Sequence, residues 1–150
     1  MACNAQTHLS NEELRSELER YSGEGSNSIV ERIKTAQPLE RKQIVDAIVE
    51  MAKEDAGRVT VPFRGNDGND NATTRARDTI LRVGYILSEA GQEDAILEAF
   101  GETYMRIEPD TRGALALSLA KCKDPRALQL IDESAREGKR QTDPRLKITS

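Results

Sequence analysis

The residues that most often carry catalysis or bind metals are scarce in this chain. His8 is the only histidine, and it lies in residues 1–9, a polar lead-in that we expect to be flexible. This argues against a histidine-dependent triad and against a histidine metal site. The two cysteines, Cys3 and Cys122, have no spacing typical of a metal motif. Cys122 lies in an apolar stretch and is predicted to be a small core residue.

Carboxylates and amides are plentiful, and one run of them follows the ligand spacing of a calcium-binding loop. However, Ala72 stands where that loop needs glycine, and Asp78 stands where it needs a bidentate glutamate. An ordinary polar loop explains the run better, and the other carboxylates are expected on exposed helix faces. We therefore predict no catalytic residue, no metal site and no cofactor, so the chain is not expected to be an enzyme. The run comprises Asp67, Asn69, Asn71, Thr73 and Asp78.

The composition favours a soluble helical domain with an aliphatic core. Aromatic residues make up 3% of the chain and there is no tryptophan, so Leu, Ile, Val and Ala must fill the core. Together with Glu, Lys and Arg, these residue types favour helices over sheets. The net charge of −4 argues against a dedicated nucleic-acid binder.

The sequence contains no apolar run near the length of about 18 residues that a membrane-spanning helix needs, and no signal sequence. We expect a cytoplasmic protein. The alternative rests on Ala2 and Cys3 followed by polar residues, which is typical of a mature bacterial lipoprotein whose leader has been left off. The chain would then be exported and lipid-anchored through Cys3.

Local signals predict one helical domain over residues 10–138. Ser10 and Glu13 form a capping-box pattern, which starts a helix over 11–21. In the last helix, Leu128, Leu130 and Ile131 are expected to face the core. Apolar periodicity predicts the other helices over 28–36, 39–55, 74–90, 93–106, 111–122 and 124–138. Residues 57–73 are expected to form a long loop and residues 139–150 a basic polar tail.

A pattern with a period of about 32 residues appears nearly twice between residues 77 and 138, which is typical of stacked helix pairs. Residues 86–96 align with residues 118–128. Each copy ends an apolar helix, turns through a short polar link, and starts another helix with Ala and a large aliphatic residue. In the first copy, Asp94, Glu98 and Glu102 form an acidic stripe on the far side of the 93–106 helix.

Residues 74–138 resemble the HEAT-repeat family, in its short bacterial form. The likeness is carried by Asp110-x-Arg112 before an apolar helix, and by a small–Leu–small ending at residues 118–120 that leads into Asp124-Pro125-x-Ala127. The upstream copy departs from the pattern, because Gln92-Glu93 replaces Asp-Pro and the position matching Arg112 is Ile80. The resemblance implies an all-α fold, with antiparallel helix pairs stacked as a short HEAT-like solenoid. It implies a scaffold or binding surface and carries over no catalytic residue.

In such stacks the second helices of successive pairs line a concave binding surface. The period places Tyr85 and Leu117 beside each other on that face with charges around them, a composition typical of a protein-binding hot spot. The predicted function is a non-catalytic protein-interaction or scaffold module whose partner is another protein. The expected contact residues are Asp78, Arg82, Tyr85, Glu89, Leu117 and Lys121. The alternative for these residues is that neighbouring segments cover them.

Other surfaces give weaker signals. Phe63, Arg64, Asp67 and Asp70 are expected to make a second contact from the 57–73 loop. An alternative function is that of a small helical-repeat nucleic-acid-binding protein, with a basic ridge as its binding surface. That ridge would comprise Arg75, Arg77, Arg82 and Arg112.

Overall fold

The computed structural model describes residues 10–21, 28–61 and 71–142, with the side chains of 138–142 excepted. This part of the chain forms helices and no strand, apart from one isolated antiparallel bridge between Thr60 and Ile107. The predicted all-α class is confirmed. The helices are α1 (Asn11–Glu19), α2 (Ser28–Thr35), α3 (Pro38–Ala56), α4 (Asn71–Glu89), α5 (Asp94–Phe100), α6 (Pro109–Leu119) and α7 (Pro125–Thr142), with 3₁₀ turns η2 (Gly57–Val59) and η4 (Tyr104–Arg106).

The helix ends follow from local sequence signals. Ser10 and Glu13 form the predicted capping box at the start of α1. Pro38, Pro109 and Pro125 each open a helix, where proline has a suitable fixed φ and its missing N–H costs nothing. Gly91 follows α4 with a φ of 77°. Its N–H and the next one bond back to the carbonyls of residues 88 and 87, which is a Schellman ending.

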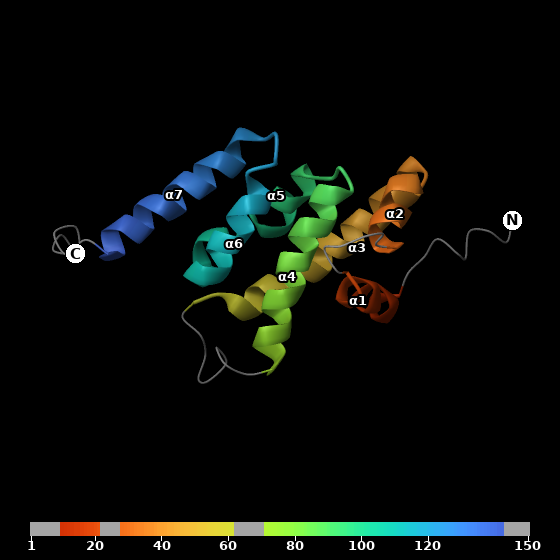
Figure 1. Ribbon diagram of the computed structural model, residues 1–150, viewed down its shortest axis with the longest axis horizontal. Coiled ribbons are helices and arrows are strands. Elements are labelled where there is room, and N and C mark those ends of the chain that lie inside the picture. The colour runs from red at the N-terminus through yellow and green to blue at the C-terminus, as the bar shows by residue number, and fades with distance from the viewer. Residues whose placement is uncertain (1–9, 22–27, 62–70, 143–150) are drawn as a thin grey trace, which may run out of the picture.

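The helices are arranged in two rows (Figure 1). α3 packs along α5 in one row and α4 packs along α6 in the other, while α3 and α4 also pack on each other. α1 and α2 lie against α4 at one end, and α7 packs on α6 and η4 at the other. The order of the elements along the molecule therefore follows their order in the chain.

One continuous aliphatic cluster fills the space between the rows. α3 contributes Ile44 and Ile48 to this cluster, and α4 contributes Ile80 and Val83. α1 covers one end of the cluster with Leu14 and Leu18, and Arg15 joins it to the buried carboxylate of Asp55 through two hydrogen bonds of 3.0 and 3.1 Å. α1 is thus fixed by both apolar burial and a charged pair.

Two contacts hold α4 against α6. A Cβ added at Gly84 would lie 2.7 Å from the Ser118 Oγ and 3.1 Å from its Cβ, so the helices touch where glycine leaves room. Near the start of α6, Arg77 donates to Glu108, which also accepts from Thr111. Burial acts to raise the pKa of the Glu108 carboxyl, but these hydrogen bonds outweigh it and hold that pKa below its ordinary value.

The predicted 57–73 loop is wrong at both ends. Gly57–Val59 forms a 3₁₀ turn with Val59 fully buried, and the Val61 N–H donates to the carbonyl of Arg106 at 2.7 Å. α4 begins at Asn71, so Asn71, Thr73 and Asp78 are helical and cannot wrap a cation as a loop would. The polar loop predicted for this run is therefore wrong from Asn71 onward. Residues 62–70 lie outside the described residues.

The predicted 93–106 helix is broken. α5 ends at Phe100, and the chain continues through Gly101 into η4. Tyr104 is nevertheless buried, and its hydroxyl donates to the Arg112 carbonyl at 3.0 Å. The periodicity survives the break because the 3₁₀ turn still carries Tyr104 back to the core.

α7 differs from the prediction in two ways. Leu128 is 57% exposed rather than inward, whereas its neighbour Ala127 is fully buried and Leu130 and Ile131 are half-buried. At this point α7 therefore packs against the rest of the fold through Ala127, a small residue. α7 also runs on to Thr142, so the predicted tail begins as helix.

Candidate functional site

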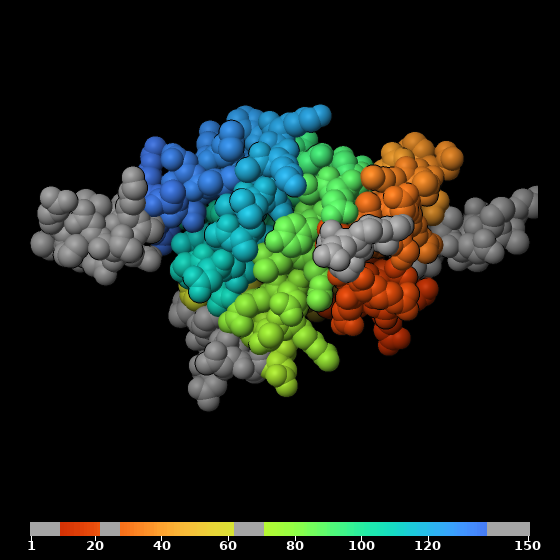
Figure 2. Space-filling model, viewed as in Figure 1, coloured from red at the N-terminus to blue at the C-terminus, as the bar shows by residue number. Residues whose placement is uncertain are grey.

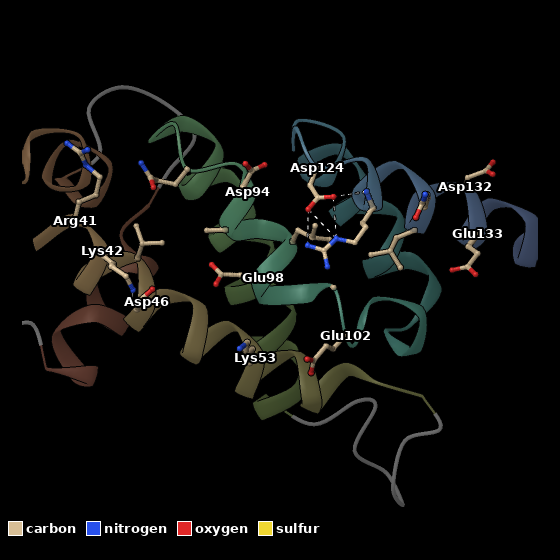
Figure 3. A pocket seen from close by; sticks show the side chains of 18 of the residues that line it. Arg41, Lys42, Asp46, Lys53, Asp94, Glu98, Glu102, Asp124, Asp132 and Glu133 are labelled. Carbon is tan, nitrogen blue, oxygen red and sulfur yellow. Dashed lines mark hydrogen bonds and ion pairs between the residues drawn. The ribbon is translucent and has the colours of Figure 1, made fainter. Parts of the chain in front are cut away.

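The structure contains an open groove of about 1370 Å³ whose floor is α5 and whose walls are α3 and α7 (Figure 3). Small-molecule pockets usually occupy about 300–1,000 Å³, so the groove is larger than most of them. The base includes apolar side chains from all three helices, namely Val45, Ala95, Leu97 and Leu130. Charged side chains surround this base.

The groove exists because α5 is short. The α3 wall is a helix of 19 residues and the α7 wall one of 18, whereas α5 has 7 residues. α5 and the residues that flank it supply the floor from Gln92 to Glu102.

Every basic side chain that lines the groove already has a partner. Lys42 pairs with Asp46 at 2.7 Å, and Lys53 pairs with Glu50 at 3.6 Å. On the α7 side, Arg126 pairs with Asp124 and Arg136 with Asp132, both at 2.8 Å. Arg41 instead donates to the carbonyls of Ile33 and Ala36, where it stabilises the end of α2.

The carboxylates of the floor have fewer hydrogen-bond and ion-pair partners than the basic side chains of the groove. Among the described residues, Glu98 and Glu102 form no hydrogen bond or ion pair, and Asp94 accepts one from the Lys123 backbone N–H at 3.0 Å. Glu98 points from α5 towards the α3 wall (Figure 3). The pKa of Lys42 is raised by its bond to Asp46 and further by the charge of Glu98. The floor thus carries carboxylates that form no direct ion pair with the walls, as far as the described residues show.

The six predicted contact residues lie on the other row of helices, α4 and the α6 region, which lie side by side in Figure 2. None of them lines the groove. Leu117 is 67% exposed, and Asp78 and Lys121 are exposed, while Arg82 is half-buried. Whether this face binds a protein stays a prediction.

Two of the six, Tyr85 and Glu89, have a structural partner. Tyr21, at the end of α1, donates its hydroxyl to Glu89 and stacks its ring on Tyr85, with the centroids 6.5 Å apart. Tyr85 remains 40% exposed. Part of the predicted contact surface therefore holds α1 against α4.

The basic ridge predicted for the nucleic-acid alternative does not form. Arg112 is 4% exposed and donates to the Met105 carbonyl at 2.7 Å, and Arg77 is paired with Glu108. Two of its four arginines are therefore engaged within the fold. The predicted loop contacts Phe63, Arg64, Asp67 and Asp70 lie outside the described residues, as do His8 and Cys3.

Cys122 is buried, as predicted, and its thiol donates to the Glu93 carbonyl at 2.9 Å. Burial raises the pKa of this thiol, which disfavours the reactive thiolate. In the described ranges, no three His, Cys, Asp or Glu side chains are grouped so as to hold a metal ion. None of the helices described is long and apolar enough to cross a membrane.

No family model, curated protein or solved structure matches this chain. The resemblance to HEAT repeats therefore stays a prediction. The groove itself was missed at the sequence level, although its signal was present as the stripe of Asp94, Glu98 and Glu102. That stripe was interpreted only as the solvent side of a helix.

Proposed function

We propose that this protein is a non-catalytic protein-interaction module, built as a short HEAT-like stack, and that it binds its partner in the groove. The observation that carries the proposal is the open groove lined by α3, α5 and α7. If the pairs are α2 with α3, α4 with α5 and α6 with α7, these three are the second helices, whereas α4 and α6, which carry Tyr85 and Leu117, are first helices. Second helices are the ones that form the binding face in helical-repeat proteins.

The geometry supports binding better than catalysis. The groove is open to water, and its carboxylates Glu98, Glu102 and Glu133 are exposed. Catalysis by charged groups gains most in a site from which water is excluded. A large open surface with an apolar base and charged edges is instead the usual anatomy of a protein contact.

Site-specific photo-crosslinking tests the proposal in cells that make the protein naturally. A photoreactive amino acid is placed at Gln129 in the groove, at Leu117 on α6, or at Glu31 on α2. All three side chains are exposed, so the fold should tolerate the replacement, and circular dichroism checks that it does. We expect Gln129 to capture a defined protein, identified by mass spectrometry, and Glu31 to capture none.

Each outcome discriminates between surfaces. Capture at Leu117 without capture at Gln129 would move the binding site to the α4–α6 face. Capture at neither position, with all variants folded and expressed, would overturn the proposed function.

A further inference from the structure

We infer that the groove binds an amphipathic helix of another protein, with an apolar stripe flanked by lysine or arginine. This inference rests on the proposed function, since it names the partner of the same groove. It follows from three properties of the groove: its length, its base and its charge.

The length suits a helix. On the α3 wall the lining runs from Pro38 to Lys53, which at 1.5 Å per residue is about 22 Å, or about four helical turns. An extended strand would need an open sheet edge to bond with, and the described residues contain no sheet. A helix has no unpaired backbone groups in its middle and needs only side-chain contacts along the walls.

The base suits a narrow apolar stripe. Val45, Ala95 and Leu97 are buried and Leu130 is half-buried, and all four line the groove. The polar groups of a wholly polar partner would find few hydrogen-bond partners among these apolar side chains. Val45, Ala95 and Leu97 are each less than a tenth exposed, so an apolar stripe would make its contacts mainly with Leu130 and with the aliphatic stems of the long charged side chains around it.

The charge favours a basic partner. The lining holds seven carboxylates and five basic side chains, so its excess of negative charge attracts a basic partner and repels an acidic one. Among the described residues, Glu98 and Glu102 form no ion pair, so both carboxylates can pair with a basic partner. Glu98 lies on α5 and Glu102 in the turn that follows it, so the two carboxylates line the floor at successive points along the groove.

The test uses two synthetic amphipathic peptides of about four helical turns and the full-length protein. Both peptides carry the same leucine stripe, and one has lysine flanks where the other has glutamate. Affinity is measured by fluorescence anisotropy, and the binding surface is mapped by backbone amide shifts in NMR spectra. We expect the lysine peptide to bind, to shift residues 92–102 most, and to weaken as salt is raised.

Charge reversal supplies the matched control. The double variant Glu98→Lys with Glu102→Lys should bind the lysine peptide about tenfold more weakly, because two partly exposed attractions become repulsions. The double variant Glu19→Lys with Glu31→Lys makes the same change in net charge at exposed positions outside the groove. It should bind within about twofold of the unmodified protein.

Equal binding of the two peptides, no binding of either, or shifts on α6 instead of α5 would each overturn the inference. These results are separable from the proposed function. If photo-crosslinking at Gln129 captures a protein while the lysine peptide fails, the groove binds a protein of another chemistry. If crosslinking also fails, the proposed function falls with it.

Discussion

At the scale of single residues, the carboxylates of Asp55 and Asp46 show how burial changes the contribution of an ion pair to the free energy of unfolding. Asp55 is 3% exposed and takes two hydrogen bonds from Arg15, whereas the side chain of Asp46, paired with Lys42, is 52% exposed. Removing one partner of a buried pair leaves the other with a poorly compensated charge. An exposed pair leaves its remaining partner in water.

We therefore expect Asp55→Ala to lower the free energy of unfolding by about 2 kcal/mol, a value below the range for fully buried pairs because Arg15 is partly exposed. Asp46→Ala should lower it by at most about 0.5 kcal/mol. Urea unfolding followed by circular dichroism measures both. Equal losses for the two variants would contradict the role given to burial.

Tyr21 makes stability depend on pH in the alkaline range. Burial raises the pKa of its phenol, and the hydrogen bond to Glu89 raises it further. In the unfolded chain this pKa is about 10. A group whose pKa is raised on folding contributes stability that is complete below the unfolded value and is lost as the pH rises above it.

The unmodified protein should therefore lose stability above about pH 10, and Tyr21→Phe should lose less over the same range. The phenyl ring can still stack on Tyr85, so the variant removes mainly the titrating hydroxyl and its bond. Urea midpoints measured at a series of alkaline pH values give the comparison. Parallel curves for the two proteins would show that Tyr21 does not titrate as described.

At the scale of elements, the contact of α4 with α6 depends on the absence of a side chain at Gly84. A Cβ there meets Ser118, whereas one at Gly113, on the exposed side of α6, meets nothing within 4 Å. Both glycines lie within helices, so replacing either with valine changes the intrinsic helix propensity by a similar amount. The difference between the two variants isolates the interhelical contact.

Gly84→Val should lower the free energy of unfolding by about 1–3 kcal/mol, because the helices must separate or shift. Gly113→Val should change it by no more than about 0.5 kcal/mol. Thermal and urea unfolding measure both. Adding Ser118→Gly should restore part of the loss in the first variant only, and failure of this rescue would mean that the damage lies elsewhere.

The elements themselves were largely predictable from sequence, because their signals are local. The capping box of Ser10 and Glu13 and the prolines that open α3, α6 and α7 set helix starts within the reach of a few residues. The break after Phe100 was not predictable from periodicity, because Tyr104 returns to the core through a 3₁₀ turn and preserves the spacing. The prediction for Leu128 is wrong because the close approach of the helices places the small residue Ala127 at the contact, although leucine is the more hydrophobic of the two.

At the scale of the whole molecule, the groove could not be predicted because it belongs to no single segment. Its walls come from residues 38–53 and 124–136, which meet across α5 only in the folded chain. The acidic stripe was visible in the sequence, but whether it faced open solvent or a hollow depended on where α3 and α7 lie. The predicted face with Tyr85 and Leu117 is on the opposite row for the same reason.

The attachment of α7 has a consequence for the width of the groove. α3 is anchored on α2, α4 and α5, whereas α7 packs chiefly on α6 and η4. The α3 wall is thus held by more neighbouring elements than the α7 wall. α6 is fixed on α4 at the close contact of Gly84 with Ser118, so a change in the distance between the walls would have to come from α7 alone.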